Sequence, residues 1–275
     1  MGRFAALGIQ QSQRARLSGA LVPLATEVVQ ASGLEPFVLR RLLSATPKHL
    51  RRAGPKPNPF LPWEPDLEVE RLGSTHLLLL NKYPVQEGHL LLITQQWKPQ
   101  AGWLERLDWQ ALALVDQDSP GLWFFNSCAA AGASQPHRHL QLLPREPGCI
   151  SCPLHEAIEA QLAGLEPAWP WRYRLSPRRA DDPAEAATEL EGLYRQHLTE
   201  LGLGTPEQDP APRRPYNLLI APQWMLTVER VQEHWAGFSI NALGFAGYLL
   251  ITEGSDTGWL HGQGPWALLR AVAAP

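Results

Sequence analysis

Lysine is scarce in this sequence: Lys48, Lys56, Lys82 and Lys98 are its four lysines, and arginine supplies the other basic side chains. Acidic residues outnumber basic ones by 27 to 24, so the formal net charge is −3 and the sequence pI is near 6.3. Proteins that bind nucleic acids or anionic membranes through general electrostatics are normally basic. The charge balance therefore argues against both of these function classes.

Cysteine is also rare, with Cys128, Cys149 and Cys152 as its three positions. An odd, low number does not fit the disulfide framework of a small secreted protein. No apolar run approaches the roughly 20 residues that cross a bilayer, and residues 1–27 lack the apolar core and cleavage site of a secretion signal. Ala6 stands where a myristoylation motif requires Ser or Thr. We therefore expect a cytoplasmic protein with reduced thiols.

What the sequence does contain is typical of a folded globular protein. Its hydrophobic content is 44% and its charged content 19%, and 275 residues suffice for one large domain or two modest ones. Apolar residues at helical spacing predict helices. These helices cover residues 12–31 (interrupted at Pro23), 38–50, 103–117 and 183–202. Between them, residues 53–66 contain five prolines and are expected to form an extended connection.

Short apolar runs predict β-strands. These strands cover residues 75–81, 89–94, 121–128, 134–144, 216–221 and 224–229. The first two and the last two form strand–turn–strand units, one in each half of the chain, which suggests a duplicated building block. Residues 239–252 form either a helix or a strand, and periodicity does not decide between them. The predicted fold class is α+β, a mainly antiparallel sheet flanked by helices, in two related halves.

The most informative segment is NSCAAAGASQPHRHLQ, residues 126–141. On a strand, His137, His139 and Gln141 share one face because side chains alternate, whereas Leu140 points to the other face. The small residues 132–135 before them leave backbone N–H groups free to approach a phosphate closely. The segment thus places two imidazoles and an amide next to a loop that can hold an anion.

This arrangement is what nucleotidyl transfer requires. An imidazole attacks the α-phosphorus, a polyphosphate leaves, and a phosphoramidate remains on the histidine. An isolated His-x-His is more often a pair of hydrogen-bonded polar residues or half of a metal site. The loop of small residues, Asn126 upstream and Gln141 downstream favour the catalytic interpretation here.

The same segment resembles the signature of the ATP adenylyltransferases, also called diadenosine tetraphosphate (Ap4A) phosphorylases. They are a branch of the histidine-triad (HIT) superfamily related to galactose-1-phosphate uridylyltransferase. Their pattern is Asn-Ser-x-x-x-x-Gly-Ala-Ser-Gln-Pro-His-x-His-x-Gln, and every fixed position is met. Three other blocks resemble the family in the same order, and the likeness extends over residues 33–252, being weakest over 148–205. These blocks are NPFLPWEP (58–65), LNKYPVQEGHLLLIT (80–94) and PYNLLIAPQWMLTVER with INALGFAG (215–230 and 240–247).

The resemblance implies roles for the motif residues. His139 corresponds to the nucleophile that becomes adenylylated, and His137 is expected to orient the site. Gln141 occupies the place of the third histidine of hydrolytic triad proteins. An amide can hydrogen-bond a phosphate oxygen in one orientation only and cannot serve as a titrating acid or base, so it favours transfer to phosphate over hydrolysis. His89, in the first hairpin, is expected to brace that turn.

The resemblance also implies a set of substrate-binding residues. Asn81 stands where related proteins direct an Asp or Asn toward the ribose hydroxyls. The full set is Asn81, Lys82, Asn126, Gly132, Ala133, Ser134, Gln135, His137, Gln141, Asn217, Leu218, Leu219, Trp224 and Lys48. For the amino-terminal lysine, Lys56 is a rival to Lys48. Glu229 replaces a family proline, so contacts from residues 229–238 are not carried over.

The implied architecture is HIT-like. Residues 1–160 form the half that carries the nucleophile, 161–214 a helical and proline-rich connection, and 215–275 the carboxyl-terminal half. The implied reaction is reversible phosphorolysis of Ap4A with inorganic phosphate to ATP and ADP through an adenylyl-histidine. Adenosine 5′-phosphosulfate is a further expected donor. No tightly bound cofactor or metal is implied, although Mg²⁺ or another divalent cation is expected to accompany the polyphosphate.

Three alternatives remain open at this point. They are a hydrolase of the same superfamily, a hexose-1-phosphate uridylyltransferase, and a catalytically silent nucleotide-binding module. Separately, Cys149, Cys152 and His155 form a C-x-x-C-x-x-H cluster that suits either a structural zinc site or two plain cysteines. The absence of a second C-x-x-C pair favours plain cysteines.

Overall fold

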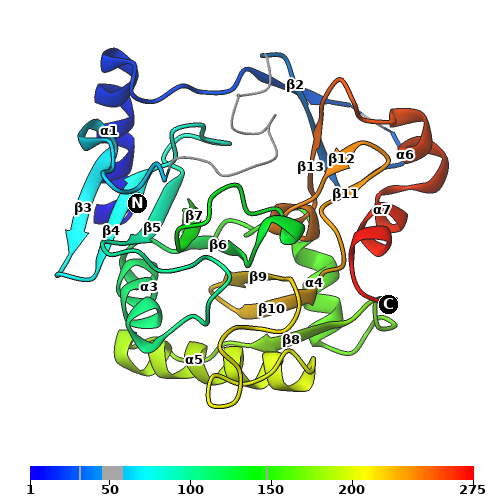
Figure 1. Ribbon diagram of the computed structural model, residues 1–275. Helices are drawn as coiled ribbons and strands as arrows, with labels where there is room; N and C mark the ends of the chain where they lie inside the picture. Colours follow the sequence, from blue (N-terminus) through cyan, green and yellow to red (C-terminus); the bar gives the residue numbers. More distant parts are fainter. Residues whose placement is uncertain (31, 45–57, 147) are drawn as a thin grey trace.

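An eight-stranded antiparallel sheet forms the centre of the computed structural model, which describes residues 1–30, 32–44, 58–146 and 148–275 (Figure 1). In spatial order its strands are β3 (Glu68–Leu72), β4 (His76–Leu80), β5 (Leu90–Thr94), β7 (His139–Pro144), β6 (Gly121–Asn126), β9 (Tyr216–Ala221), β10 (Trp224–Glu229) and β8 (Tyr173–Pro177). The predicted α+β class with a mainly antiparallel sheet is confirmed.

The two halves of the chain meet inside this sheet. Strand β6 of the first half pairs with β9 of the second, with Phe125 opposite Leu218 and Asn126 opposite Asn217. Every backbone pair between these two strands lies between fully buried residues. The sheet is thus continuous, and its middle strands β7, β6 and β9 are buried on both faces.

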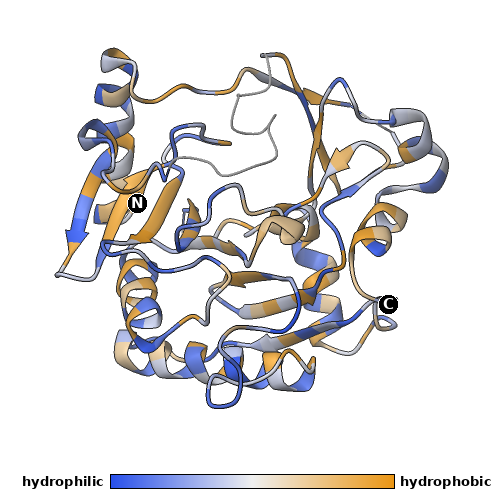
Figure 2. Ribbon diagram, in the orientation of Figure 1, coloured by the Kyte–Doolittle hydropathy of each residue, from blue (hydrophilic) through white to orange (hydrophobic). Residues whose placement is uncertain are grey.

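Three helices cover one face of the sheet: α1 (Arg3–Ser18), α3 (Arg106–Asp118) and α5 (Pro183–Glu200) (Figure 1). Side chains such as Trp123, Leu142 and Leu218 pack under them in one hydrophobic cluster. The apolar colour of the central strands and the mixed colour of α3 and α5 in Figure 2 show the same division. Burial of large apolar side chains against amphipathic helices is the main stabilising term of such a layer.

The opposite face carries a second cluster, which includes Phe124, Leu143 and Leu219. It is covered by α4 (His155–Leu162), by a small sheet and by the carboxyl-terminal helices α6 (Thr257–Gln263) and α7 (Pro265–Val272). In the small sheet β2 (Val38–Leu42) pairs antiparallel with β1 (Thr26–Val29) and parallel with β13 (Tyr248–Ile251). Because side chains alternate, His139 and Gln141 project to this second face together with Leu143.

Short elements complete the chain. They are the 3-10 helices η1 (Pro65–Leu67), η2 (Ala129–Ala131) and η3 (Ala242–Ala246) and the two-stranded ribbon β11 (His234–Trp235) and β12 (Phe238–Ser239). The region 239–252, for which a helix and a strand both remained open, divides into η3 and β13. Among the described residues, no helix has the length and apolar character that a bilayer crossing demands.

Two of the predicted helices are wrong. The helix predicted over 12–31 instead lies at 3–18 and ends at Gly19, whose φ of 79° is left-handed; the chain then enters β1. The face of this helix that packs against the core contains small residues such as Gly8, Ser12 and Ala15, so the sequence shows no stripe of large apolar residues there. The first part of the helix predicted over 38–50 is strand β2, and residues 45–57 lie outside the described ranges.

Other boundaries also differ. The strand predicted over 134–144 begins only at His139, because residues 132–136 form a loop. The predicted connection 161–214 contains β8, which is an edge strand of the main sheet. The predicted strands 75–81, 89–94, 121–128, 216–221 and 224–229 and the helices 103–117 and 183–202 are confirmed within a few residues.

Candidate functional site

The two strands β6 and β7 separate where the motif begins. Their backbone pairing ends with Phe124 opposite Gln141, and the buried side chain of Gln100 occupies the gap beyond it. Its Oε1 accepts the backbone N–H of His139 at 2.8 Å, and its Nε2 donates to the carbonyls of Asn126 at 2.7 Å and His139 at 3.3 Å. One amide thus replaces the missing strand contacts and fixes the backbone of His139.

The tautomer of the His139 ring follows from one hydrogen bond. Nδ1 lies 2.8 Å from the carbonyl oxygen of His137, which can only accept, so Nδ1 carries the proton. Nε2 therefore carries the lone pair. Within the described ranges Nε2 has no hydrogen-bond partner. Unlike the fully buried polar atoms that lack a partner, it keeps some accessible surface. This nitrogen is free to act as a nucleophile.

His139 is held in a nearly closed environment. Its side chain is 3% exposed, and the ring of Phe60 packs against it with the ring centroids 5.5 Å apart. Burial lowers the pKa of His139 to about 4, although the hydrogen bond to the carbonyl of His137 acts in the opposite direction. The imidazole is therefore neutral at physiological pH, which is the state that attacks phosphorus.

His137 is fixed on both ring nitrogens. Nε2 donates to the carbonyl of Thr94 at 2.8 Å, so Nδ1 accepts from the Asn58 side-chain amide at 3.0 Å. Phe60 and Trp97 pack edge-on against the ring, with centroids 5.6 and 5.4 Å away. With both nitrogens engaged, His137 has no free lone pair for attack; its carbonyl orients His139.

Gln141 follows His139 on the same strand face and contacts a third histidine. Its Oε1 lies 3.1 Å from Nε2 of the buried His89. Asn81 meets the other nitrogen of the His89 ring, with its Nδ2 3.4 Å from Nδ1. The Oδ1 of Asn81 accepts the backbone N–H of Tyr83 at 3.0 Å. The Asn81 side chain, expected at the ribose, is engaged in the turn of this hairpin.

The loop of residues 132–135 holds unpaired donors. The N–H groups of Gly132 and Ala133 close the η2 turn on the carbonyls of Ala129 and Cys128. By contrast, the N–H groups of Ser134 and Gln135 have no partner in the described part of the chain. Two consecutive free amides just before strand β7 can hold an anion.

Gly132 is required by the geometry of this loop. Its φ is 88°, and a Cβ added to it would lie 2.6 Å from Cβ and 2.8 Å from Cα of Asn241. That asparagine is itself fixed, because its Oδ1 accepts the N–H of Leu243 and caps η3. Any other residue at 132 would push the anion-holding loop away from η3.

Asn126 and Asn217 lie opposite each other where the two halves join. Nδ2 of Asn217 donates to Oδ1 of Asn126 and to the carbonyl of Ala131, both at 2.8 Å, and Oδ1 of Asn217 accepts from Arg230. Arg230 is fully buried and also donates to the carbonyl of Ile240 at 2.9 Å. Asn217 therefore holds η2 through the carbonyl of Ala131, and Asn126 supports it by accepting from Asn217 and from the N–H of Ala242 at the start of η3.

The other predicted substrate-binding residues that the structure describes make no hydrogen bond or ring contact with His139. Leu218 points to the helix-covered face, Leu219 packs in the second cluster, and Trp224 has no exposed surface. Lys82 is exposed at the start of the hairpin turn. Lys48 and its rival Lys56 lie outside the described residues.

Arg138 explains the break in the alternation of the motif. Its guanidinium lies on the helix-covered face, where it donates to Asp108 at 3.0 Å and Glu105 at 3.1 Å. Burial acts to raise the pKa of Asp108, but the hydrogen bond from His76 and the charge of Arg138 outweigh it and lower the pKa. This buried ion pair ties the residue before His139 to the start of α3.

The cysteine cluster is not arranged as a metal site. Cys149 is exposed and Cys152 is buried, where burial raises the pKa of its thiol to about 11. Across residues 1–30, 32–44, 58–146 and 148–275, no three His, Cys, Asp or Glu side chains are grouped to hold a metal ion. The zinc interpretation therefore has no support in the described geometry.

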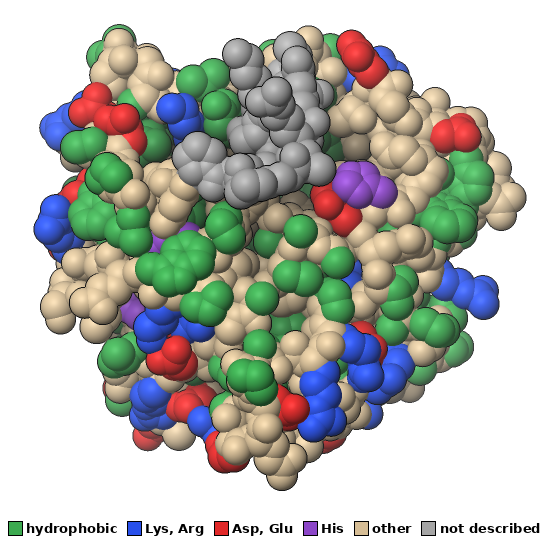
Figure 3. Space-filling view, in the orientation of Figure 1, with side chains coloured by type: hydrophobic (Ala, Val, Ile, Leu, Met, Phe, Trp, Pro, Cys, Tyr) green, Lys and Arg blue, Asp and Glu red, His purple; other side chains and the backbone are tan. Residues whose placement is uncertain are grey.

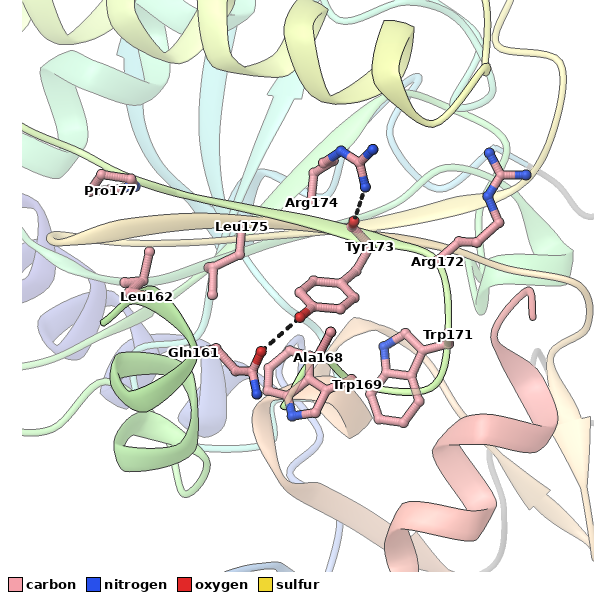
Figure 4. A pocket seen from close by; sticks show the side chains of 10 residues that line it. All are labelled: Gln161, Leu162, Ala168, Trp169, Trp171, Arg172, Tyr173, Arg174, Leu175 and Pro177. Carbon is pink, nitrogen blue, oxygen red and sulfur yellow. Dashed lines mark hydrogen bonds between the residues drawn. The ribbon is translucent and has the colours of Figure 1, made fainter. Parts of the chain in front are cut away.

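A surface cavity of about 550 Å³ lies elsewhere, between α4 and β8 (Figure 4). Trp169, Tyr173 and Leu175 line it; Tyr173 donates to Gln161 at 2.7 Å and Arg174 pairs with Glu200. Nε1 of Trp171, which also lines the cavity, is buried and has no hydrogen-bond partner in the described part of the chain. None of the motif residues lines it. On the face shown in Figure 3, basic and acidic side chains are interspersed around apolar ones.

Sequence reasoning did not assign Gln100, Arg230 or Phe60 to the site. Gln100 and Phe60 lie in connections without periodicity, and Arg230 falls in the region set aside because Glu229 replaces a family proline. Glu229 is buried and paired with Arg172 and Arg214, so the replacement is locally compensated. Pro99 and Gly102, on either side of Gln100, indicate a turn but not the role of its side chain.

Comparison with known proteins gives a consistent result. Residues 2–160 match the Ap4A phosphorylase N-terminal domain family, and residues 167–275 match the ATP adenylyltransferase C-terminal domain family. The protein APA1 of Saccharomyces cerevisiae is 36% identical over 77 residues, which are 26% of this chain and 24% of the yeast protein, so the match spans about a quarter of that relative.

The fold is similar to that of solved yeast structures. The yeast Ap4A phosphorylase Apa2 in complex with Ap4A superposes with a TM-score of 0.73 at 18% identity, covering 99% of this chain and 98% of the other. The same yeast protein in complex with AMP gives a TM-score of 0.74 at 20% identity, covering 100% and 98%. These likenesses establish the architecture.

Proposed function

The chain belongs to the Ap4A phosphorylase and ATP adenylyltransferase family, and on that premise we propose that it is a nucleotidyltransferase that cleaves Ap4A with inorganic phosphate to ATP and ADP. The proposed nucleophile is Nε2 of His139. The reverse direction makes Ap4A from ATP and ADP. Adenosine 5′-phosphosulfate is a second proposed donor, from which sulfate would leave.

The observation that carries this proposal is the state of the His139 ring. Its proton is held on Nδ1 by the carbonyl of His137, and Nε2 has no hydrogen-bond partner in the described ranges. A neutral imidazole with a free lone pair needs no separate base to attack phosphorus. When Nε2 bonds to the α-phosphorus the ring becomes cationic, and the carbonyl of His137 stabilises that charge through Nδ1–H.

The first step forms the Nε2–phosphorus bond and breaks the bond from the α-phosphorus to the bridging oxygen. ATP leaves with the electron pair on its terminal phosphate, which is stable as an anion and needs no acid from the protein. In the second step an oxygen of inorganic phosphate attacks the same phosphorus, giving ADP and returning the lone pair to Nε2. Each step displaces one group at phosphorus, so no net oxidation occurs.

The free N–H groups of Ser134 and Gln135 and the half-buried Gln141 are the proposed contacts for the phosphate oxygens. Asn126 and Asn217 act by holding the loop that presents these amides, and Gly132 by allowing its close approach to η3. Because none of these donors titrates near neutral pH, they can stabilise the negative charge on the phosphate oxygens but cannot remove a proton from an attacking water.

The proposal is tested with Ap4A labelled at the α-phosphorus. Brief incubation without phosphate is expected to leave a base-stable, acid-labile label on His139, and the variant His139→Asn should carry none. Adding phosphate should convert the label to ADP. Label on another residue, or full turnover by the variant, contradicts the assignment.

Product analysis separates the neighbouring activities. A phosphorylase gives ATP and ADP in a phosphate-dependent reaction, whereas a hydrolase of the same superfamily gives AMP whether or not phosphate is present. A hexose-1-phosphate acceptor that outcompetes phosphate would identify a uridylyltransferase-like enzyme. Nucleotide binding without any phosphoramidate would identify a silent binding module.

A further inference from the structure

Gln141 can present either of two opposite groups to a substrate. Its side-chain amide ends in a carbonyl oxygen, which accepts hydrogen bonds, and in an NH₂ group, which donates two. Only the NH₂ group is attracted to a phosphate oxygen, whereas the carbonyl oxygen is repelled by it. The use of Gln141 in the proposed reaction therefore depends on what fixes the orientation of this amide.

The hairpin turn behind Gln141 provides a fixed starting point. The N–H group of Tyr83 is a backbone donor, so the atom of Asn81 that meets it at 3.0 Å is the acceptor Oδ1. The other end of Asn81, Nδ2, then faces Nδ1 of His89 at 3.4 Å. The backbone N–H of Val85 faces the same Nδ1, also at 3.4 Å.

These contacts determine the tautomer of His89. Two donors converge on Nδ1, so this nitrogen must carry the lone pair, and in a neutral ring the proton lies on Nε2. The ring is neutral because burial lowers the pKa of His89 to about 3, against a smaller raising effect of the hydrogen bond with Gln141. The nearby His139 lowers the pKa further.

The tautomer in turn determines the orientation of Gln141. Nε2–H of His89 donates, so the atom of Gln141 that lies 3.1 Å away is the acceptor Oε1. The NH₂ group of Gln141 is left without a partner in the described part of the chain. Gln141 and His139 project from the same face of β7, so this NH₂ group belongs to a side chain on the same face of the sheet as the proposed nucleophile.

From this chain of contacts we infer that His89 is a positioning residue of the transfer reaction: it holds Gln141 so that the amide presents hydrogen-bond donors to a non-bridging oxygen of the α-phosphate. The inference rests on the proposed function for its substrate, and it adds a role beyond the bracing of the hairpin. It also gives Asn81 and the turn at Val85 a part in catalysis, as the elements that set the His89 tautomer.

The environment of His89 supports a role in orientation. The side chain is 2% exposed and its ring lies 5.8 Å, centroid to centroid, from that of Phe124, so it cannot turn over without disturbing the second cluster. A ring that is locked, neutral and hydrogen-bonded at both nitrogens transmits the orientation of a backbone donor in the turn to a side chain on the neighbouring strand β7, where Gln141 lies opposite Leu91. A freely rotating amide at 141 would spend part of its time with the repelled carbonyl oxygen toward phosphate.

Two substitutions separate the two roles of His89. In His89→Asn the short side chain reaches the position of Nδ1, so it can still accept from Val85, but it cannot reach Gln141. In His89→Gln the amide reaches the position of Nε2 and can still donate to Gln141, but the acceptor for the turn is lost. His89→Asn thus loses the contact with Gln141 and keeps the contact with the turn, whereas His89→Gln keeps the contact with Gln141 and loses the contact with the turn.

The readout is the preference between the Rp and Sp isomers of Ap4A carrying a phosphorothioate at the α-phosphorus. A donor aimed at one non-bridging oxygen distinguishes the isomers, and Gln141→Ala calibrates the loss of that preference. We expect His89→Asn to lose the preference as Gln141→Ala does and to lose about 10- to 100-fold in kcat with a smaller change in KM. His89→Gln, whose NH₂ group can still donate to Gln141 but is no longer oriented by the turn, should retain more of the preference than His89→Asn.

The opposite pattern, with His89→Asn normal and His89→Gln impaired, overturns the inference and leaves His89 as a brace. Two normal variants also overturn it. If both variants are impaired, His89→Asn is combined with Gln141→Ala. An effect of His89→Asn that disappears in this background supports positioning through Gln141, and one that persists refutes it.

A measurement on the unliganded wild-type protein keeps this inference separate from the proposed function. Nitrogen-15 NMR of the imidazoles should show His89 protonated on Nε2 alone and unchanged between pH 5 and 8. A proton on Nδ1, or titration near pH 6.5, refutes the orientation mechanism even if the enzyme is fully active. Conversely, the expected tautomer with no labelling of His139 would leave His89 as an orienting residue and overturn the proposed reaction.

Discussion

Gln100 holds His139 by its backbone on both sides, accepting from its N–H at 2.8 Å and donating to its carbonyl at 3.3 Å. The same amide donates to the carbonyl of Asn126 on the neighbouring strand. Strands β6 and β7 can therefore separate without leaving unsatisfied backbone groups.

Replacing this amide should affect the reaction more than substrate binding. Gln100→Leu preserves bulk but leaves the N–H of His139 and the carbonyl of Asn126 unpaired, which costs about 1–3 kcal/mol of stability for each buried group. We expect single-turnover adenylylation to slow by at least about 10-fold, because small displacements of a reacting group carry such costs. Gln100→Glu, which keeps the acceptor for His139, is the matched control and should slow the reaction less. Equal adenylylation rates for Gln100→Leu and the wild type would contradict the role of Gln100 in holding the backbone of His139.

The pH dependence of adenylylation should reflect the buried nucleophile. Because burial lowers the pKa of His139 to about 4, the ring stays neutral as the pH falls well below the ordinary value of 6.5. The rate of label transfer to His139 in the absence of phosphate should therefore be level from pH 8 to about 5 and decline toward pH 4. Measurement by rapid quench avoids the second step. A decline centred near 6.5 would indicate a solvated ring and a different arrangement of the site.

The stability of the protein should fall in mildly acidic solution. Burial lowers the pKa of His89 to about 3 and the pKa values of His139 and His197 to about 4, so the unfolded chain binds protons at these residues that the folded chain does not. The contribution of each neutral ring to the free energy of unfolding is complete above pH 6.5. It decreases as the pH falls toward the pKa of that histidine in the folded state, by about 3 kcal/mol for a shift of this size.

Urea unfolding between pH 7 and 4 measures this loss. Lowered pKa values of carboxyl groups such as Asp108 act in a separate window, below their ordinary value near 4. The ring of His197 is hydrogen-bonded to Ser176 and Thr227 and not to a motif residue. It therefore contributes its own part of the loss of stability at low pH. His197→Gln should fold and show a shallower decline of stability between pH 6.5 and 4 than wild type. An unchanged slope would mean that His197 is protonated in the folded state.

Gly132 offers a test of the loop against a close control. Gly132→Ala combines a left-handed φ with a Cβ that meets the backbone of Asn241, whereas Gly164→Ala has a left-handed φ of 67° with nothing within 4 Å. We expect about 1–2 kcal/mol of destabilisation for Gly164→Ala from the backbone alone. Gly132→Ala should cost a further 1–3 kcal/mol, about the usual cost of overpacking, and should raise KM for Ap4A. Equal costs and an unchanged KM would show that the loop adjusts freely.

Sequence patterns predicted the centre of this fold better than its edges. Strands β4, β5, β9 and β10 are runs of buried, mainly apolar residues. Helix α5 consists mostly of strong helix formers, so its sequence predicts a helix and nothing else. The edge strands β3 and β8 are half-exposed and contain Glu and Arg, so they have no apolar run to reveal them. Helix α1 buries small residues, and its apolar pattern was therefore misplaced toward the next segment.

For the site, the sequence identified the motif but not its supports. His137, His139 and Gln141 are close in the chain, so local periodicity was enough to place them together. Gln100, Thr94 and Arg230 reach the same site from connections and from another strand. Which long-range partner a buried amide or guanidinium meets depends on the packed fold, and no local spacing encodes it.

The pairing of β2 with β13 joins residues 38–42 to residues 248–251, near opposite ends of the chain. During synthesis, one edge of β2 must therefore wait until almost the whole protein has left the ribosome, with only β1 available to cover its other side. Contacts of such long sequence separation form late and slow the final stage of folding. Chains truncated before residue 248 should thus depend on chaperones and be removed by proteolysis, even though the strand that bears the nucleophile is already complete.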